Sequence, residues 1–394
     1  MRTIKRSSVF GIAVIPLLAL AAGCGSSGGG GGSLSGGTKS TIVIGTTIPL
    51  SGVAGPVCRP ISDAATAWFD HINAEGGING RMIEQKILDD QYQAPLALAN
   101  AKKLSQAGVF AIFGGCGTIQ PPAVESIAGP ANIPYLFPNA SVPSLKSSAN
   151  AYLLLPTYDQ QLPGLIKYAV PKFGAGTAYA VVGQVPGSDA VINAVRDTAS
   201  AVGVDMVGES LTTPGQADLS SVILKIKEAK PDYLILADGV NALRLFQGLA
   251  AQNALPAKKI LGYSAAAQAV ANAGAGVLPD GMFLAASAVA APNSPEMKTC
   301  DDVTNSASPN SANNPDVGYS CAAAQALTTA LQEAGPDLTR DSFNKVLLGW
   351  QSKDIFPGLT PLSFTSDDRV GEHSMFVLTL QKGALESTGT LPLD

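Results

Sequence analysis

The sequence has very little histidine and no concentration of positive charge. Its two histidines, His71 and His373, stand about 300 residues apart in a chain of 394 residues. Histidine-rich metal sites and most histidine-dependent catalysis therefore have little support. No cluster of lysine and arginine is longer than a pair, and the net charge is −5. Nucleic acid, which binds extended basic surfaces, is excluded as a partner.

The sequence also lacks the short motifs of common enzyme classes. It contains no Cys-x-x-Cys, no nucleophile elbow and no glycine-rich phosphate loop followed by lysine. The neighbouring acids Asp89 and Asp90 are interpreted as a solvated turn or as partners of Arg81, and not as a catalytic pair. We therefore expect no enzymatic activity, no cofactor and no bound metal.

The one apolar run of any length is too short to cross a membrane. Residues 9–22 follow the basic Arg2, Lys5 and Arg6, and a spanning helix needs about 20 residues. This order is typical of an export signal. The run ends in Leu-Ala-Ala-Gly-Cys, which resembles the lipobox of bacterial lipoproteins, where the chain is cut before a cysteine that then carries a diacylglycerol. That cysteine is Cys24, and the alternative is an ordinary secretory signal cut nearby.

Removal of residues 1–23 changes the mature chain. Three basic residues and no acidic one are lost, which leaves 22 basic against 30 acidic side chains and a net charge of −8. Residues 24–40 are mostly glycine and serine, which is typical of a flexible tether. We expect an exported protein held at the outer face of the cytoplasmic membrane by lipidated Cys24.

Four cysteines follow Cys24, at positions 58, 116, 300 and 321. An even number in an oxidising compartment predicts two disulfides, and the sequence alone permits three pairings.

Predicted strands and helices alternate along the chain. Strands are expected at residues 41–50, 82–88, 109–113, 134–137, 178–182, 205–211, 233–236 and 259–262, and helices at 61–74, 96–106, 119–128, 162–170, 191–202, 219–229, 243–252 and 322–334. Residues 51–60 and 292–317 are expected to be loops, and residues 361–380 two short strands around a turn at 366–368. This alternation predicts an α/β protein with parallel sheets, and its length favours two lobes. Ligands of such sheets bind at the carboxyl ends of the strands.

Several segments, taken in their order along the chain, resemble the type I periplasmic binding proteins of the branched-chain amino acid and amide type. They are IVIGTTIPLSG, INAEGGINGRMIEQKILDDQY, AKKLSQAGVFAIFGG, IPYLFPNAS, YDQQ, PGSD, KPDYLILADG and GLTPLSFTSDD, within residues 41–385. The resemblance implies two doubly wound parallel-sheet lobes joined by a three-strand hinge. Lobe 1 would hold residues 41–157 plus 284–365, and lobe 2 residues 158–283 plus 366–394.

The resemblance also implies a function. Such a protein, here a monomer, captures a small polar solute (an amino acid, an amide, a urea-like molecule or a small carboxylate) between its lobes. It then delivers the solute to an ABC permease for import. The alternative is a ligand sensor of the same fold that reports to a signalling partner.

The family's ligand contacts fall on identifiable residues of this chain. They are Arg59, Cys116, Gly117, Thr118, Asn139, Ala140 and Ser141 in the first lobe, and Tyr158, Asp159, Gln184, Ser188 and Asp238 in the second. Backbone N–H groups and the Thr118 hydroxyl would hold a carboxylate, with Ser141 in the same role, and Arg59 would grip an anionic group. Structural alternatives stay open: loop hydroxyls and Asp238 can cap helices, Tyr158 can pack in the hinge, and Arg59 can be a surface residue.

One position departs from the amino-acid binders. Their glutamate that pairs the ligand's ammonium aligns with Ala242. A buried ammonium without a carboxylate partner costs several kcal/mol. The ligand is therefore not expected to be an ordinary α-amino acid, unless Asp238 replaces that glutamate.

The implied lobes favour one disulfide pairing. Cys58 and Cys116 fall on loops after the first and third strands of one lobe, whose ends are neighbours. We therefore expect Cys58–Cys116, and Cys300–Cys321 closing a polar loop.

Overall fold

The computed structural model describes residues 40–393 except 141, 274–275 and 308–313. The predicted export signal, the lipidation site Cys24, the tether up to residue 39 and Ser141 lie outside the described residues. The described elements belong to one compact unit, residues 34–394. Across the described part of the chain, no helix combines the length and apolar character needed to cross a membrane.

The first sheet is entirely parallel, with strand order β2-β1-β3-β4-β5. Its strands are β1 (Thr41–Ile48), β2 (Met82–Asp89), β3 (Ala111–Phe113), β4 (Tyr135–Leu136) and β5 (Ala151–Tyr152). Residues rich in β-branched side chains form β1, which is buried because strands lie on both sides of it. In the register of β1 and β2, Thr41 lies opposite Met82 and Ile48 opposite Asp89.

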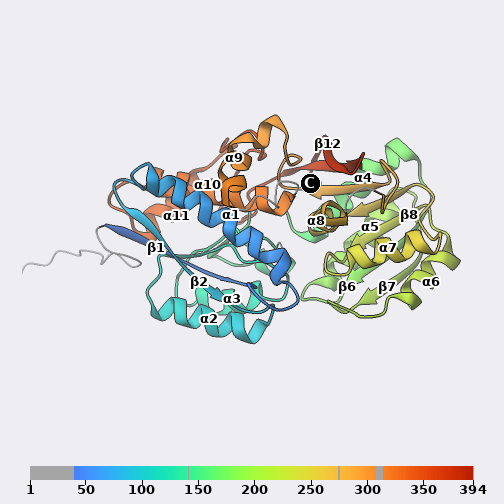
Figure 1. Ribbon diagram of the computed structural model, residues 1–394, viewed down its shortest axis with the longest axis horizontal. Coiled ribbons are helices and arrows are strands. Elements are labelled where there is room, and N and C mark those ends of the chain that lie inside the picture. The colour runs from blue at the N-terminus through green and yellow to red at the C-terminus, as the bar shows by residue number, and fades with distance from the viewer. Residues whose placement is uncertain (1–39, 141, 274–275, 308–313, 394) are drawn as a thin grey trace, which may run out of the picture. The chain divides into compact units, whose positions relative to one another are not determined.

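Helices from both ends of the described chain complete this first lobe. They are α1 (Gly55–Ala74), α2 (Ala94–Gln106), α3 (Pro121–Ala128), α9 (Lys298–Ala307), α10 (Pro315–Ala334) and α11 (Arg340–Gly349), with the 3-10 turns η1 (Pro143–Leu145) and η2 (Pro295–Met297). Figure 1 shows α1, in blue, beside the orange α10. Trp68 Nε1 donates to Thr328 Oγ1 at 3.1 Å, and Ser320 Oγ donates to the Ile61 carbonyl at 2.7 Å.

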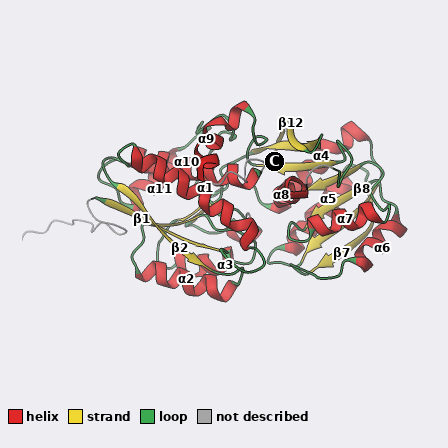
Figure 2. Cartoon of the chain, viewed as in Figure 1, coloured by secondary structure: helices red, strands yellow, loops and turns green. Residues whose placement is uncertain are grey.

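The second sheet has seven strands in the order β12-β11-β10-β9-β8-β6-β7. Its strands are β6 (Thr177–Gly183), β7 (Asp205–Thr212), β8 (Tyr233–Ala237), β9 (Lys259–Gly262), β10 (Phe283–Ser287), β11 (Ser374–Gln381) and β12 (Ala384–Pro392). Its helices are α4 (Tyr158–Phe173), α5 (Ser188–Ala201), α6 (Ser220–Ala229), α7 (Ala242–Ala251) and α8 (Ser264–Ala273). Strands β6 to β10 run parallel, and β11 and β12 add an antiparallel hairpin. Figure 2 shows strands of this sheet in yellow among the red helices of the lobe.

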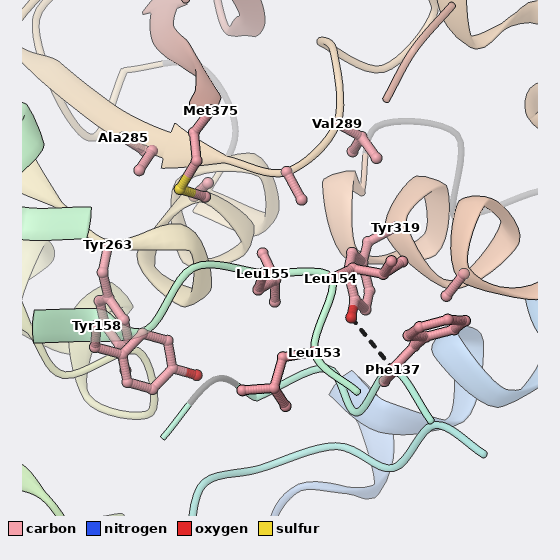
Figure 3. Close-up of a cluster of buried hydrophobic side chains, with 14 of the residues drawn as sticks. Phe137, Leu153, Leu154, Leu155, Tyr158, Tyr263, Ala285, Val289, Tyr319 and Met375 are labelled. Atoms are coloured by element: carbon pink, nitrogen blue, oxygen red, sulfur yellow. Dashed lines mark hydrogen bonds between the residues drawn. The ribbon is translucent and has the colours of Figure 1, made fainter. Parts of the chain in front are cut away.

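Three chain crossings, at residues 153–157, 288–294 and 350–373, join the two lobes and lie against one another. Between the second and third, the Ala290 N–H donates to the Gly358 carbonyl at 3.0 Å. In the first and third crossings, the Leu153 N–H donates to the Arg369 carbonyl at 2.8 Å, and the Gly371 N–H donates to the Leu153 carbonyl at 2.7 Å. Figure 3 shows Leu153, Leu154 and Leu155 running between Tyr158 and Tyr319. The three-strand hinge implied by the resemblance is therefore confirmed.

The helices differ from the sequence predictions in several places: α8 and α11 were not predicted, and α10 begins at Pro315 instead of residue 322. Helix α1 begins at Gly55, inside the predicted loop, because Pro56 occupies the first turn, where its missing N–H is not needed. The polar segment 292–317 was expected to be a loop, yet it contains α9. Buried Cys300 and Thr304 anchor that helix to the core.

The strands near the C-terminus also differ. The hairpin turn lies at Lys382 and Gly383, whose φ angles are 49° and 80°, and not at residues 366–368. Positive φ at both positions matches the twist of a two-residue hairpin. Strand β10 pairs with β9 and β11, so residues 284–287, assigned to lobe 1 from the sequence, lie in the second sheet.

Candidate functional site

A cavity of about 250 Å³ lies where the carboxyl ends of strands from both sheets face each other. At about 30 Å³ each, it has room for about eight waters, which suits a small molecule. From the first lobe it is lined by Val53, Ala54, Val57, Cys58, Tyr92, Cys116, Gly117, Thr118, Asn139 and Asp316. From the second lobe it is lined by Tyr158, Val182, Gly183, Val185, Ser188, Val191, Pro214, Ala237, Asp238, Gly239, Val240, Leu243, Tyr263, Ser264, Ala265, Gln268 and Ala269.

The loop after β3 holds the Tyr92 side chain. Burial raises the pKa of the Tyr92 phenol, and the neighbouring Thr118 opposes the rise. Gly117 has a φ of +102°, and a Cβ there would overlap the Tyr92 ring. Glycine is therefore required both by the backbone and by the close approach of the tyrosine.

Asp90 fixes the turn that carries Tyr92. It accepts hydrogen bonds from the Thr47 hydroxyl at 3.0 Å, the Tyr92 N–H at 3.0 Å and the Gln120 side chain at 3.4 Å. Burial raises the pKa of Asp90 to about 6 against these bonds. The expectation of a solvated Asp89-Asp90 turn is wrong for Asp90, which is fully buried and bonded to Thr47 and Gln120.

Two tyrosines of the second lobe meet on the cavity wall. The rings of Tyr158 and Tyr263 are perpendicular, with centroids 4.5 Å apart, as Figure 3 shows. The Tyr263 hydroxyl accepts from the Gly239 N–H at 2.9 Å, which ties it to the loop after β8. This edge-to-face pair forms a rigid apolar surface beside the hinge.

Asp238 lines the cavity, but protein groups already bind its carboxylate. Its Oδ2 accepts from the Thr212 hydroxyl and, at 2.8 Å, from the Asn241 side chain. Its Oδ1 accepts from the Asn241 N–H at 3.1 Å. Asp238 therefore anchors the turn that leads into α7, which is the structural alternative considered for it. Ala242, the first residue of α7, is fully buried and contributes only a methyl group.

Two further polar side chains reach the cavity. Burial raises the pKa of Asp316, at the start of α10, to about 7, and the neighbouring Asn139 opposes the rise. Gln268 on α8 is only 6% exposed. Its Nε2 is buried and has no hydrogen-bond partner among the described residues.

The two disulfides join the expected partners. Cys58–Cys116 links α1 to the loop after β3, and both cysteines line the cavity. Cys300–Cys321 links α9 to α10. Among the residues the structure describes, no group of three or more histidine, cysteine, aspartate or glutamate side chains could hold a metal ion.

The structure brings seven of the predicted contact residues to the cavity. They are Cys116, Gly117, Thr118, Asn139, Tyr158, Ser188 and Asp238.

Four predicted contact residues do not line the cavity. Arg59 is exposed and donates to the Leu50 carbonyl, because α1 begins early and turns its side chain outward. Asp159 forms an ion pair with Lys146 at 3.0 Å, Gln184 is exposed, and Ala140 is buried in the core. Ser141 lies outside the described residues.

Sequence reasoning missed Tyr92, Tyr263, Gln268, Asp316 and most of the apolar wall. Tyr92 lies in the turn after a predicted strand, and this position could have marked it. Asp316 lies in a segment interpreted as a loop, and nothing in its neighbourhood in the sequence points to the cavity.

A sequence profile described as "Periplasmic binding protein" matches residues 41–384. The chain belongs to the periplasmic binding protein family. Members of this family act outside the cytoplasm, and the architecture above is their type I fold. The two lobes, three crossings and interlobe cavity of this binding protein are thus those the sequence resemblance implied.

The relatives of this binding protein are distant in sequence. It is 24% identical over 195 residues to "Leu/Ile/Val-binding protein BraC3" of Rhizobium johnstonii, a match that covers 49% of this chain and 53% of that protein. The chain thus spans about half the length of the curated relatives it matches.

Solved structures resemble this binding protein over most of its length. A fatty acid ABC transporter substrate-binding protein from Thermomonospora curvata has a TM-score of 0.80 and 21% identity, with 91% of this chain and 94% of that one covered. A solute-binding protein from R. palustris in complex with benzoate has a TM-score of 0.77 and 17% identity, with 90% and 98% covered. At these identities the likeness shows the fold alone.

Proposed function

We propose that this protein captures a small solute in the interlobe cavity and delivers it to an ABC importer. The observation that carries the proposal is the cavity itself, which two lobes line from opposite sides next to three hinge crossings. Ligand contacts made from both lobes favour the closed form, so binding shifts the population toward closure. The closed form then docks on the permease and releases its cargo unchanged.

The surroundings of the cavity support binding rather than conversion. Among the described residues that line it there is no histidine or lysine, and Cys58 and Cys116 are joined in a disulfide. Asp238 is held by three donors of the protein. We therefore propose that the protein is a monomeric binding protein without enzymatic activity, tethered to the outer face of the cytoplasmic membrane through lipidated Cys24.

Uptake by a reconstituted transporter tests the function. Proteoliposomes that contain the cognate permease and ATPase are supplied with ATP and with a solute found by thermal-shift screening. Uptake should depend on added binding protein, and the solute should be recovered with unchanged mass. Uptake that proceeds equally without the binding protein would contradict delivery, and a solute of altered mass would contradict a purely binding role.

A cavity-filling variant supplies the matched control. Ala265→Trp places an indole in the cavity and should abolish both binding and uptake, since Ala265 lines the cavity. Ala201→Trp adds the same group at an exposed position at the end of α5 and should leave both unchanged.

A further inference from the structure

Helix α8 has one face on the core and another on the cavity. Ala266 and Val270 are buried in the hydrophobic core. Ala265, Gln268 and Ala269 line the cavity, and their spacing of three and four residues places them on one face of the helix. Two of these three side chains are methyl groups, and the third is a polar amide.

The amide of Gln268 carries a buried donor without a partner. Gln268 is 6% exposed, and its Nε2 has no hydrogen-bond partner among the described residues. Because most buried polar groups are hydrogen-bonded, an exception in a cavity wall points to a partner from outside the chain. Water can accept from this amide while the cavity is open. A solute that displaces the water must supply the acceptor itself, since a donor left unpaired weakens binding.

The first turn of α8 holds this donor in a fixed place. The Ser264 N–H donates to Gln161 Oε1 at 2.9 Å, and Gln161 Nε2 donates to the Pro156 carbonyl at 2.6 Å. On another side, a Cβ on Gly239 would come within 2.9 Å of the Ala265 carbonyl oxygen, so the loop after β8 packs directly against α8. The helix is thus attached to both α4 and that loop, and a donor positioned in advance loses little freedom when a solute binds.

The two buried glutamines of this region differ in one respect. Gln161 is fully buried, and both polar atoms of its amide are bonded to the backbone. Gln268 is buried almost as deeply, yet its Nε2 faces no acceptor among the described residues. Gln161 therefore has a structural role, whereas the amide of Gln268 is available to a molecule in the cavity.

We propose that Gln268 is a specificity-determining residue, whose Nε2 donates to an acceptor oxygen at the end of the solute that faces α8. A carboxylate, an amide and an alcohol each supply such an oxygen, whereas an ammonium has donors only. This inference rests on the proposed function and adds to it the group that the solute must present to α8.

Thermal unfolding without any solute gives the first test. Gln268→Met keeps the length of the side chain and removes an unpaired donor, so the unfolding temperature should stay the same or rise. Gln161→Met is the matched control. It removes two buried hydrogen bonds and should lower the unfolding temperature by about 3–6 °C. A decrease of the same size in Gln268→Met would show a structural role and overturn the proposal.

Matched probes test the contact itself. Benzamide, benzoate, benzyl alcohol and benzylammonium are titrated into the full protein at pH 8 by calorimetry, and the same four end groups are tested on a 4-methylpentyl body. The oxygen probes that bind the parent should bind Gln268→Met about tenfold more weakly, and the end group that loses most identifies the oxygen. Gln247→Met, at an exposed position on α7, should leave these affinities unchanged. Equal affinity of the oxygen probes for the parent and for Gln268→Met would overturn the proposal, as would failure of all six to bind.

Gln268→Glu separates a role in specificity from a structural one. Its ionised carboxylate has acceptors only, so the oxygen probes should bind about tenfold more weakly and the two ammonium probes about tenfold more tightly. A structural role, or a bond that Gln268 forms to the first lobe on closure, would instead weaken all eight probes alike and overturn the proposal.

These outcomes are separate from those of the uptake experiment. A probe whose affinity depends on Gln268 but that the reconstituted transporter does not import would refute the transport function and leave the Gln268 contact standing. An imported solute that binds the parent and Gln268→Met equally well would refute the contact and leave the transport function standing.

Discussion

Single residues at strand ends decide what this cavity can hold. Gly117 is the clearest example, because two separate constraints exclude a Cβ atom there: its positive φ and its closeness to the Tyr92 ring. A Cβ at this position must push the ring or the backbone, and either movement disturbs the packing of the Tyr92 ring against the loop after β3.

Gly117→Ala should lower the free energy of unfolding by about 1–3 kcal/mol, which is the cost of holding alanine at such a φ. It should also change ligand affinity, because the ring moves. Gly215→Ala is the matched control, since Gly215 has a φ of +74° with nothing within 4 Å of the added Cβ. Chemical denaturation and ligand titration of both variants check this, and equal loss of affinity in the two would contradict it.

A site residue could be predicted when the sequence around it determines its position, and could not when distant parts of the chain determine it. Thr118, Asn139 and Ser188 follow strands, so the sheet rule and the family pattern brought them to the cavity. Arg59 could not be placed, because its direction depends on whether α1 begins at residue 55 or 61. Asp316 could not be predicted, because only tertiary packing brings α10 against the loop that carries Asn139.

At the scale of elements, the position of Asp316 at the start of α10 has two opposing effects on the charge of its carboxyl group. A helix N-terminus favours a carboxylate by about 0.3–2 kcal/mol, whereas burial favours the protonated acid. The pKa of about 7 shows that burial is the larger effect.

Stability should therefore depend on pH through Asp316. The pKa of Asp316 is raised in the folded state, so the folded protein favours the protonated acid. The contribution of this acid to the free energy of unfolding is complete below pH 4 and is lost as the pH rises toward 7. Asp316→Asn should gain stability relative to the parent between pH 4 and pH 8, by up to about 4 kcal/mol for three pKa units. Asp90 and Glu372, whose pKa values are also raised, are common to both proteins and cancel. A difference that stays constant with pH in denaturation experiments would refute this.

The two disulfides should have separable effects. Each should contribute about 2–4 kcal/mol to stability. Cys58→Ala with Cys116→Ala should also weaken ligand binding, because that bond joins α1 to the loop that holds Tyr92. Cys300→Ala with Cys321→Ala removes a bond away from the cavity and should leave affinity intact. Calorimetric unfolding and ligand titration measure both effects, and equal affinity losses would contradict this assignment.

Helices and strands were predicted correctly where the hydrophobic periodicity was strong. They were missed where the composition of a segment was typical of another structure. Strand β9 was predicted with its observed ends, residues 259–262. Helix α9 was missed because its sequence is polar, and a disulfide and a few buried side chains hold it in place. Strand β10 and helix α8 are short apolar runs, which periodicity alone cannot assign.

At the scale of the whole molecule, the cavity has an apolar rim that ligand binding should cover. Val53 is 81% exposed and Val240 is 48% exposed, although both line the cavity from different lobes. Closure around a ligand would remove this apolar surface from water, which favours the closed form.

Saturation with ligand should therefore reduce the radius of gyration measured by small-angle X-ray scattering. Val53→Ser or Val240→Ser should weaken ligand binding by about 1 kcal/mol, since a fully buried valine contributes about 1.5–3 kcal/mol, and leave unfolding unchanged. Leu224→Ser, at a residue 51% exposed on α6 outside the cavity lining, is the control. An unchanged radius at saturation would contradict hinge closure.

The interleaving of the chain has a consequence for how the protein is made. The first lobe needs α10 and α11, which follow strands β6 to β10 of the second lobe in the sequence, and the second sheet is incomplete until β11 and β12 have been synthesised. The bond between Trp68 and Thr328 spans 260 residues. Contacts so distant in sequence form late and slowly. A nascent chain therefore has no finished lobe that must be unfolded again before it is threaded through a translocation channel.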